Sequence, residues 1–456
     1  MVMYRSTRGG SPPVRFDQAV LQGFASDGGL FVPHPLPRIS RDRLEKWQQH
    51  GYIDLAKEVM GLYLDPDIVP RRDLERLLDQ SFEAFDSPDP PLVSPDQDGR
   101  NWILELFHGP TLSFKDVAMG FLIRVMDYFL EKNDERLSLI LATTGDTGPA
   151  AAYAAADRMR ISCLPLYPAG MISREQELQM TTIGAENVCP VEVKDCENGG
   201  DDLDVVVARL FADEQLRKRL KLSSVNSINI GRVLMQTVHY FYSYLRIVKR
   251  LGDPLVFSIP AGAFGNLAGG ELARAMGLPI EFICATNKNK TLHRIFADGI
   301  FEKSQLQQSV SSAIDIVIPY NFWRFLYLRC GGEMEVVNRA VLEFERSGKV
   351  VFDDTLHRKL QQGVVSTSVS DSMTLETIGA LYERTGYLLD PHGAVAVAGS
   401  VQCRPRFAEK TPFVSVATAH PAKFPEVIRK ALPTDQQLPE SALHRSIESA
   451  KKAATK

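Results

Sequence analysis

The sequence lacks the features that mark membrane, secreted or nucleic-acid-binding proteins. Its 456 residues contain no run of about 18 apolar residues, and the first stretch, MVMYRSTRGGSPPV, has no apolar signal region. The formal net charge is −4, whereas nucleic acid and anionic lipid attract proteins with a basic excess. We therefore expect a cytoplasmic protein without nucleic-acid or membrane partners.

Metal-binding and disulfide patterns are also missing. The six cysteines include no C-x-x-C pair and the nine histidines no H-E-x-x-H motif, so we predict neither a disulfide framework nor a metal site. The rest of the composition is ordinary, with 44% hydrophobic and 24% charged residues. A chain of this length can form more than one domain and bury a large core.

The chain divides at a proline-rich stretch. Residues 85–101, FDSPDPPLVSPDQDGRN, combine four prolines with several aspartates and predict a linker. Helical patterns precede it at 40–64 and 71–85. After it, strands alternate with helices, which predicts an α/β fold with mostly parallel sheets and helices on both faces. We expect strands at 102–107, 137–143, 161–167, 187–193, 254–260 and 279–286, helices at 149–159, 173–185, 201–220, 229–250 and 267–277, and a loosely held tail after Pro433.

A lysine occupies an unusual position in the stretch FHGPTLSFKDVAMGFLIRVMDYFL, residues 107–130. Counting three, four and seven residues on from Lys115 gives only apolar side chains, so its amine lies on the stripe that should face a core. The S-x-x-D spacing of Ser113 and Asp116 predicts a capping box, with Lys115 as the second residue of the helix.

The predicted surroundings lower the pKa of the Lys115 amine. An apolar site disfavours its charged form, and so does the positive end of the helix dipole. An uncharged amine near neutral pH is suited to bonding with a carbonyl carbon. The alternative is a lysine that extends from the helix end into solvent.

Two strand-to-helix turns have the composition of ligand sites. LATTGDTGPAAAY offers hydroxyls, glycines and a helix opened by Pro149, which favours a carboxylate, although Thr147 or Gly148 could simply cap that helix. FSIPAGAFGNLAGGELARAMG places Gly262 and Gly265 around a turn suited to a phosphate. The second turn matches neither G-x-G-x-x-G nor G-x-x-x-x-G-K-[ST], so dinucleotide and P-loop interpretations lose support.

Parallel strands gather such turns at one edge of a sheet. A reactive lysine, a carboxylate site and a phosphate site are together what pyridoxal 5'-phosphate and an amino-acid substrate require. The sequence therefore favours an enzyme that uses this cofactor.

Several motifs resemble one family. LELFHGPTLSFKDVA, TGDTG, YPAGMISREQELQMTT, VNSINIGRVLMQ, PAGAFGNLAGG, LDPHGAVAV and TAHPAKF are similar to the threonine synthase family, as are the N-terminal YRSTRGGSP and DGGLFVP. The resemblance spans nearly the whole chain and implies fold type II of the pyridoxal-phosphate enzymes, which is tryptophan synthase β-like. It also implies three domains, namely an N-terminal domain at 1–90, a large cofactor-binding domain at 91–120 and 226–456, and a small α/β domain at 121–225.

The resemblance implies roles for individual residues. Lys115 matches the catalytic lysine that bonds to the cofactor, and Thr418 the hydroxyl residue beside the pyridine nitrogen. Asp146 matches a residue near the phenolic oxygen of the cofactor. The phosphate-binding loop of the cofactor corresponds to Gly262, Ala263, Phe264, Gly265 and Asn266. Substrate contacts correspond to Thr143, Thr144, Gly145 and Thr147 for the carboxylate and to Asn226, Ser227, Asn229 and Arg232 for the phosphate, although the last group could instead cap the following helix.

The implied reaction converts O-phosphohomoserine and water to threonine and phosphate, by a monomer or a homodimer. Two departures keep alternatives open. Ala263 stands where the family usually has asparagine, and Thr144 where serine is usual. A threonine-synthase-like branch of phospho-lyases also lacks that asparagine and gives 2-oxobutyrate. A β- or γ-substitution enzyme with another acceptor is a further alternative, and a catalytically silent binding homologue is the last.

Overall fold

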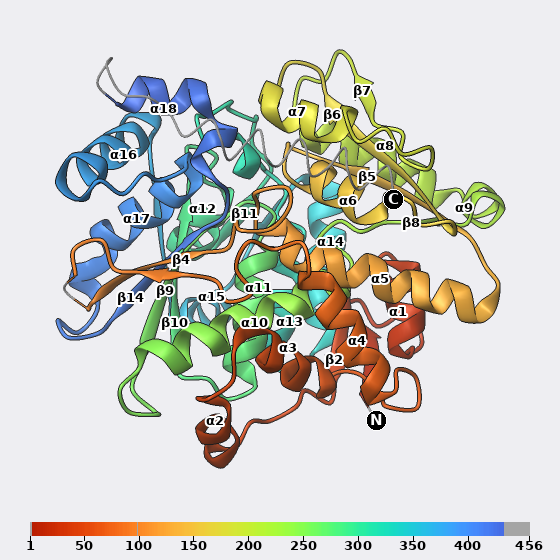
Figure 1. The fold of residues 1–456 in the computed structure, drawn as a ribbon, viewed down its shortest axis with the longest axis horizontal. Helices are drawn as coiled ribbons and strands as arrows, with labels where there is room; N and C mark the ends of the chain where they lie inside the picture. The colour runs from red at the N-terminus through yellow and green to blue at the C-terminus, as the bar shows by residue number, and fades with distance from the viewer. Residues whose placement is uncertain (1, 98, 433–456) are drawn as a thin grey trace.

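The computed structural model describes residues 2–97 and 99–432, and the predicted tail after Pro433 lies outside them. Two sheets dominate the fold (Figure 1). The larger has six strands in the order β13-β10-β9-β14-β4-β3, all parallel except β3. These strands are β3 (Leu92–Val93), β4 (Asn101–Glu105), β9 (Leu255–Pro260), β10 (Ile280–Thr286), β13 (Val364–Ser368) and β14 (Phe413–Ala417).

The smaller sheet is fully parallel, with the order β7-β6-β5-β8, and lies at the upper right of Figure 1. Its strands are β5 (Leu137–Ala142), β6 (Ile161–Pro168), β7 (Val191–Val193) and β8 (Leu222–Ser223). The helices that accompany it are α6 (Thr147–Ala155), α7 (Arg174–Thr181), α8 (Gly200–Ala212) and α9 (Glu214–Leu220).

Helices cover both faces of the large sheet. Successive side chains of a strand point to opposite faces, and every residue of β9 is buried, so both faces need a cover. In β9, Phe257 packs edge-on against Tyr240 with 4.7 Å between the ring centroids, whereas Val256 clusters with Cys403 on the other face. Tyr240 belongs to α10 (Ile230–Ile247) and Cys403 to α17 (Pro391–Cys403). The predicted α/β class, with mostly parallel sheets, is confirmed.

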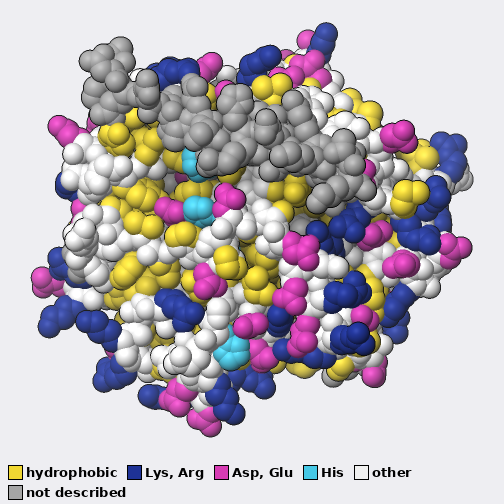
Figure 2. Space-filling model, in the orientation of Figure 1, with side chains coloured by type: hydrophobic (Ala, Val, Ile, Leu, Met, Phe, Trp, Pro, Cys, Tyr) yellow, Lys and Arg dark blue, Asp and Glu magenta, His cyan; other side chains and the backbone are white. Residues whose placement is uncertain are grey.

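The N-terminal segment packs under the two sheets as a helical layer, red to orange in Figure 1. Its elements are β1 (Met3–Ser6), α1 (Phe16–Gln22), β2 (Phe31–His34), α2 (Arg41–Trp47), α3 (Tyr52–Gly61) and α4 (Arg71–Phe82). Helix α3 packs against α10, and α4 against α5 (Lys115–Asn133). Figure 2 shows acidic and basic side chains intermingled on the face that it views.

The remaining elements fill the space around the large sheet. They are α11 (Gly265–Ala275), α12 (Thr291–Asp298), β11 (Ile300–Glu302), α13 (Phe322–Arg329), α14 (Met334–Ser347), β12 (Lys349–Val351), α15 (Asp354–Gln361), α16 (Asp371–Thr385) and α18 (Pro425–Ala431). Three short 3-10 turns, η1 (Ser312–Ile314), η2 (Arg404–Arg406) and η3 (Pro421–Lys423), complete them. Within the described ranges, no helix is long and apolar enough to cross a membrane.

The structure differs from three local predictions. The helix expected at 201–220 is two helices, because Asp213 adopts an extended conformation and its side chain caps α9 by accepting from Leu216 N. The expected linker 85–101 contains the short strand β3, which pairs with β4. The helix predicted to open at Pro149 starts instead at Thr147. The domain boundaries after residues 90, 120 and 225 remain a proposal.

Candidate active site

A cavity of about 260 Å³ lies at the carboxyl ends of strands from both sheets. Residues that directly follow β5, β9 and β14 line it, together with the first turns of α5, α10 and α11. Phe24, Gly28 and Leu30 of the N-terminal segment contribute a further part of the wall. Ligands of parallel sheets bind at such edges, where loops from distant parts of the chain meet.

Lys115 is the first residue of α5 and lines this cavity half-buried. Ala118, Met119 and Leu122, on the same stripe of the helix, are at most 1% exposed. The Lys115 Nζ lies 4.3 Å from the centroid of the Phe114 ring. Among the described residues, no hydrogen bond or ion pair reaches this amine, so it is available to a ligand.

The Lys115 amine has a strongly lowered pKa, at about 7. Burial is the main cause, because the apolar surroundings disfavour the charged form. Arg232 and Lys423 lower the pKa further by repulsion, whereas Asp146 acts in the opposite direction. A substantial fraction of the amine is therefore uncharged at neutral pH.

The predicted capping box is wrong. The side chain of Asp116 accepts hydrogen bonds from Thr111 N at 2.9 Å and Thr111 Oγ1 at 2.6 Å, and so faces back into the preceding loop. The Ser113 hydroxyl is buried without a hydrogen-bond partner. Asp116 therefore stabilises the loop before α5, and Lys115 is the first helical residue instead of the second.

The turn after β5 is held by side chains. Thr143 Oγ1 accepts from Gly145 N at 3.1 Å and from Gly148 N at 2.9 Å, and thereby satisfies free amides near the start of α6. Gly145 has a φ of 122°, and a Cβ there would lie 2.3 Å from Gln176 Oε1. Only glycine fits this position without displacement.

Asp146 is the charged member of this turn and is 3% exposed. Its Oδ1 lies 2.8 Å from Lys423 Nζ and accepts from Gln176 Nε2 at 3.0 Å. Although burial raises the pKa of Asp146, Lys423, His392 and Lys115 lower it more, so the net shift is downward. The carboxyl group therefore stays ionised.

The turn after β9 is shaped mainly by its backbone. Phe264 has a φ of 64°, in the left-handed region that non-glycine residues rarely adopt, and it precedes the first residue of α11. A Cβ on Gly262 would lie 2.9 Å from Ile314 Cα. The amides at the start of α11 are open to an anion, as a phosphate requires.

Within the described part of the chain, four side chains along the cavity carry buried polar atoms without a hydrogen-bond partner. They are Asn226 Oδ1, Arg232 Nε, Gln236 Oε1 and Asn266 Nδ2. Buried polar atoms are costly to leave unpaired, so each is available for a ligand. Arg232 is 1% exposed and also donates to Val225 O at 2.9 Å, which fixes its guanidinium beside the cavity.

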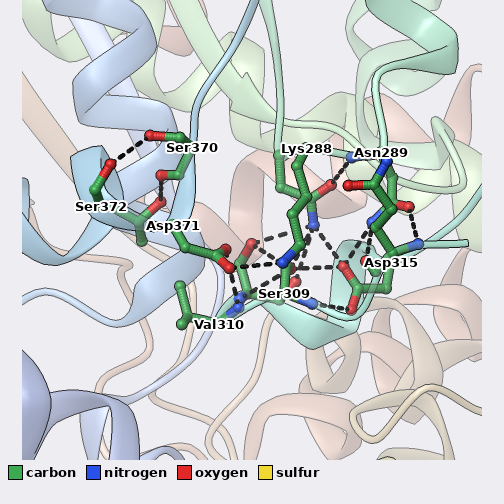
Figure 3. A network of polar contacts seen from close by, with 12 residues as sticks. Lys288, Asn289, Ser309, Val310, Asp315, Ser370, Asp371 and Ser372 are labelled. Atoms are coloured by element: carbon green, nitrogen blue, oxygen red, sulfur yellow. Dashed lines mark hydrogen bonds and ion pairs between the residues drawn. The ribbon is translucent and has the colours of Figure 1, made fainter.

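His392 and the segment 309–317 form another wall. His392 Nε2 accepts from Ala313 N at 3.1 Å, so Nδ1 carries the proton that is donated to Asp390 Oδ1 at 2.8 Å. Figure 3 shows how this segment is anchored, with Asp315 accepting from Ser309 and Asn289. From the turn after β5, Thr144 Oγ1 donates to Ala313 O at 3.3 Å.

The structure brings together most of the residues predicted from the sequence. The cavity is lined by Lys115, Thr143, Thr144, Asp146, Thr147, Asn226, Ser227, Arg232, Gly262, Ala263, Phe264, Gly265, Asn266 and Thr418. Gly145 and Asn229 do not line it. Asn229 caps α10 by accepting from Gly231 N at 3.1 Å, and it donates to Val20 O at 2.8 Å. The roles of all these residues remain proposals.

Sequence reasoning missed three residues. His392 and Gln236 line the cavity, and Lys423 pairs with Asp146. All three fall within motifs that carry the family resemblance, namely LDPHGAVAV, VNSINIGRVLMQ and TAHPAKF. The available signal was a further charged or polar side chain inside a motif that already carried the family resemblance.

The residues present fit pyridoxal 5'-phosphate. The unpaired Lys115 amine can bond to an aldehyde, the start of α11 can bind a phosphate, and Asn266 Nδ2 is a buried donor that lacks a partner. In agreement, residues 91–342 match the family described as pyridoxal-phosphate dependent enzyme. The protein is a pyridoxal-phosphate-dependent lyase of fold type II.

Its family follows from the ends of the chain. Residues 3–82 match the family described as threonine synthase N terminus, and residues 393–453 match threonine synthase, C-terminal. Over 432 residues the chain is 38% identical to the threonine synthase of Pseudomonas aeruginosa, covering 94% of this chain and 90% of that protein. The human protein named threonine synthase-like 2 is 38% identical over 433 residues, covering 94% and 89% of the two chains.

Solved structures agree. The pyridoxal-phosphate-bound threonine synthase from Brucella melitensis superposes with a TM-score of 0.90 at 33% identity, and all of both chains is covered. The chain therefore belongs to the threonine synthase family.

Proposed function

We propose that this protein is a threonine synthase, which converts O-phosphohomoserine and water to threonine and phosphate. The observation that carries the proposal is the buried Arg232, whose Nε lacks a partner beside a cavity that also contains the reactive amine. A guanidinium with a free N–H suits the phosphate of a phosphorylated amino acid. Asn226 and Ser227, on the turn before α10, line the same cavity.

The substrate carboxylate has its own candidate site. Thr143, Thr144 and Thr147 line the cavity at the start of α6, where hydroxyl groups and the positive end of the helix dipole favour an anion. With the phosphate at Arg232 and the carboxylate at this turn, the substrate is held at both ends. Its carbon chain then passes Lys115.

Lys115 is the proposed proton-transfer residue. Bound pyridoxal phosphate supplies an electron sink for the carbanions of amino acids. The Lys115 amine, whose pKa is about 7, can take a proton at Nζ near neutral pH and return it. Phe114, whose ring centroid lies 4.3 Å from Lys115 Nζ, and Ile314 line the same cavity with apolar side chains, which reduces the access of water.

The product distinguishes this proposal from a phospho-lyase that gives 2-oxobutyrate. That second candidate is favoured by Ala263 and by the similarity to proteins named threonine synthase-like 2. Incubation of the protein and cofactor with O-phosphohomoserine should release phosphate and threonine in equal amounts. Phosphate with 2-oxobutyrate would select the phospho-lyase, and the Lys115→Ala variant should release phosphate more slowly by a factor of about 10³ or more.

A substitution enzyme with another acceptor also has a specific observation in its favour. Asp201 and Asp204 of α8 line the cavity, and burial raises the pKa of Asp201 to about 6 and that of Asp204 to about 7. Carboxyl groups there would favour an acceptor that carries an amine. The test is to add amines as competing acceptors during incubation with O-phosphohomoserine. Formation of a new amino acid would support this candidate, whereas formation of threonine at the same rate as without amines would exclude it.

We further propose that the protein acts in the cytoplasm as a monomer or homodimer, on a small phosphorylated amino acid and without nucleic-acid or membrane partners. The absence of phosphate release from O-phosphohomoserine would overturn both leading functions at once.

A further inference from the structure

Lys423 is a buried lysine that the proposed chemistry does not use. It is 0% exposed and lies in the 3-10 turn η3, shortly after the last strand. Its Nζ lies 2.8 Å from Asp146 Oδ1 and donates to Thr111 O at 3.0 Å. One side chain therefore connects three segments that meet at the cavity, namely the loop before α5, the turn before α6 and the loop after β14.

The Lys423–Asp146 pair uses only one of the two carboxylate oxygens of Asp146. Asp146 Oδ1 receives both Lys423 and Gln176. Among the described residues, no hydrogen bond or ion pair engages Oδ2, and Asp146 lines the cavity. The pair therefore fixes the orientation of the carboxylate while leaving an acceptor for a ligand.

Stability alone does not account for this pair. Burial of two charges costs several kcal/mol of hydration for each ion, and an apolar pair of similar volume is often as stable. Lys288 and Asp371 form an ion pair with the same kind of geometry, 2.7 Å apart, with side chains 31% and 33% exposed (Figure 3). Asp371 of that pair anchors the wall segment by accepting from Val310 N, and both charged side chains are partly exposed to solvent. Of these two pairs, only the Lys423 pair includes a residue that lines the cavity, namely Asp146.

The charges around Lys115 come from several elements. Arg232 of α10 and Lys423 repel a proton on its amine, and Asp146 attracts one. His392 of α17 faces Asp146, and Asp116 of α5 faces both Arg232 and Lys423. Removal of Lys423 would leave Asp146 to take Lys115 as its counterion.

We propose that Lys423 is a positioning residue for Asp146. It keeps the Asp146 carboxylate ionised and oriented and balances its negative charge, so that Asp146 does not hold a proton on the Lys115 amine. The inference concerns groups of this chain alone. It stands whether the product is threonine, 2-oxobutyrate or another amino acid, and its test therefore needs no substrate.

The test measures the pH midpoint at which Lys115 becomes reactive in the full-length, cofactor-free protein. A small acylating reagent is applied at each pH, and labelling of the Lys115 peptide is followed by mass spectrometry. Lys423→Met should raise the midpoint by about one unit or more, because a nearby charge shifts a pKa by this amount. Lys423→Arg, which keeps the charge, should stay close to the wild-type midpoint.

Lys288→Met is the matched control, because it removes an ion pair of similar length outside the cavity. It should leave the Lys115 midpoint unchanged. If Lys423→Met does not fold, as judged by circular dichroism, Lys423→Gln replaces it. Glutamine keeps hydrogen-bonding capacity without the charge, and the same rise is expected.

The double variant Lys423→Met with Asp146→Asn separates charge from packing. Once the carboxylate is also neutral, the midpoint should return toward the wild-type value. The absorbance of bound cofactor, titrated against pH without substrate, should shift in Lys423→Met and recover in Lys423→Arg. An unchanged or lowered midpoint in both Lys423→Met and Lys423→Gln would overturn the proposal, as would a rise that persists in the double variant.

Discussion

Two strand-to-helix turns border the same cavity by different means. In the turn after β5, a threonine hydroxyl binds two backbone amides, and Asp146 is held by Lys423 and Gln176. In the turn after β9, Phe264 adopts a left-handed backbone and the amides at the start of α11 remain open. The first turn therefore presents a fixed charge and hydroxyls, and the second presents mainly backbone donors.

The difference indicates which changes each turn should tolerate. A backbone-built site depends on space for the main chain and is insensitive to most side chains. A side-chain-built site depends on the identity and charge of each member. The following predictions test this contrast. The first concerns Lys115, which lines the cavity that both turns border.

Replacement of Lys115 by alanine should have the largest effect. The variant loses the amine that is proposed both to bond to the cofactor and to transfer the proton, so phosphate release should fall by a factor of about 10³ or more. The measurement is phosphate release from O-phosphohomoserine, together with the absorbance of the bound cofactor. A variant that still releases phosphate at the wild-type rate would show that the reaction does not depend on the Lys115 amine.

The pH dependence of cofactor uptake should be the next largest effect. Uptake needs the uncharged Lys115 amine, whose pKa is about 7, so below that pH the rate should fall about tenfold for each pH unit. Above it, the rate should level off. Stopped-flow absorbance of the cofactor-free protein mixed with cofactor measures this, and a rate that still rises toward pH 10 would contradict the lowered pKa.

A pair of glycine substitutions should then separate the two turns. Gly145→Ala places a Cβ 2.3 Å from Gln176 Oε1 at a φ of 122°, and strain of this kind costs about 1 to 3 kcal/mol. It should lower the Tm and also loosen Asp146. Gly262→Ala should instead weaken cofactor binding, because its Cβ would meet the main chain of Ile314.

Gly252→Ala is the control for this pair. Gly252 has a φ of 107°, close to that of Gly145, with no atom within 4 Å of the added Cβ, so it isolates the conformational cost from the collision. Equal effects of Gly145→Ala and Gly252→Ala on Tm would remove the packing argument.

Ala263→Asn should have the smallest effect on the cofactor. If backbone amides hold the phosphate, the dissociation constant should change by no more than about threefold, equivalent to roughly 0.7 kcal/mol. The ratio of threonine to 2-oxobutyrate is the sharper measurement, because Ala263 lines the cavity. A large loss of cofactor affinity would show that side chains also govern the second turn.

Local sequence patterns predicted where Lys115 lies in the fold. Lys115 follows a loop and precedes a long apolar stripe, and periodicity alone places it at a buried helix start. The details of its cap were wrong because Asp116 has a nearer partner in Thr111, within a loop whose path no periodic pattern specifies. The helical pattern of the sequence also could not reveal the break at Asp213, because the residues on both sides of it are helical.

Long-range partners were the main omission. Lys423 is 277 positions after Asp146, and His392 reaches the backbone of Ala313 from another helix. Nothing in the spacing of such residues states that they will meet, because the topology of the large sheet decides it. Asn229 illustrates the reverse case, since a polar residue of a family motif is occupied in capping a helix.

The position of β14 has a consequence for biosynthesis. This strand is close to the end of the described chain, yet it lies between β9 and β4 in the middle of the six-stranded sheet. Until it leaves the ribosome, the nascent protein has two separate half-sheets, each with an exposed hydrophobic edge. Assembly of the cavity must therefore wait until β14 has been translated, and chaperones have an interval in which to protect those edges.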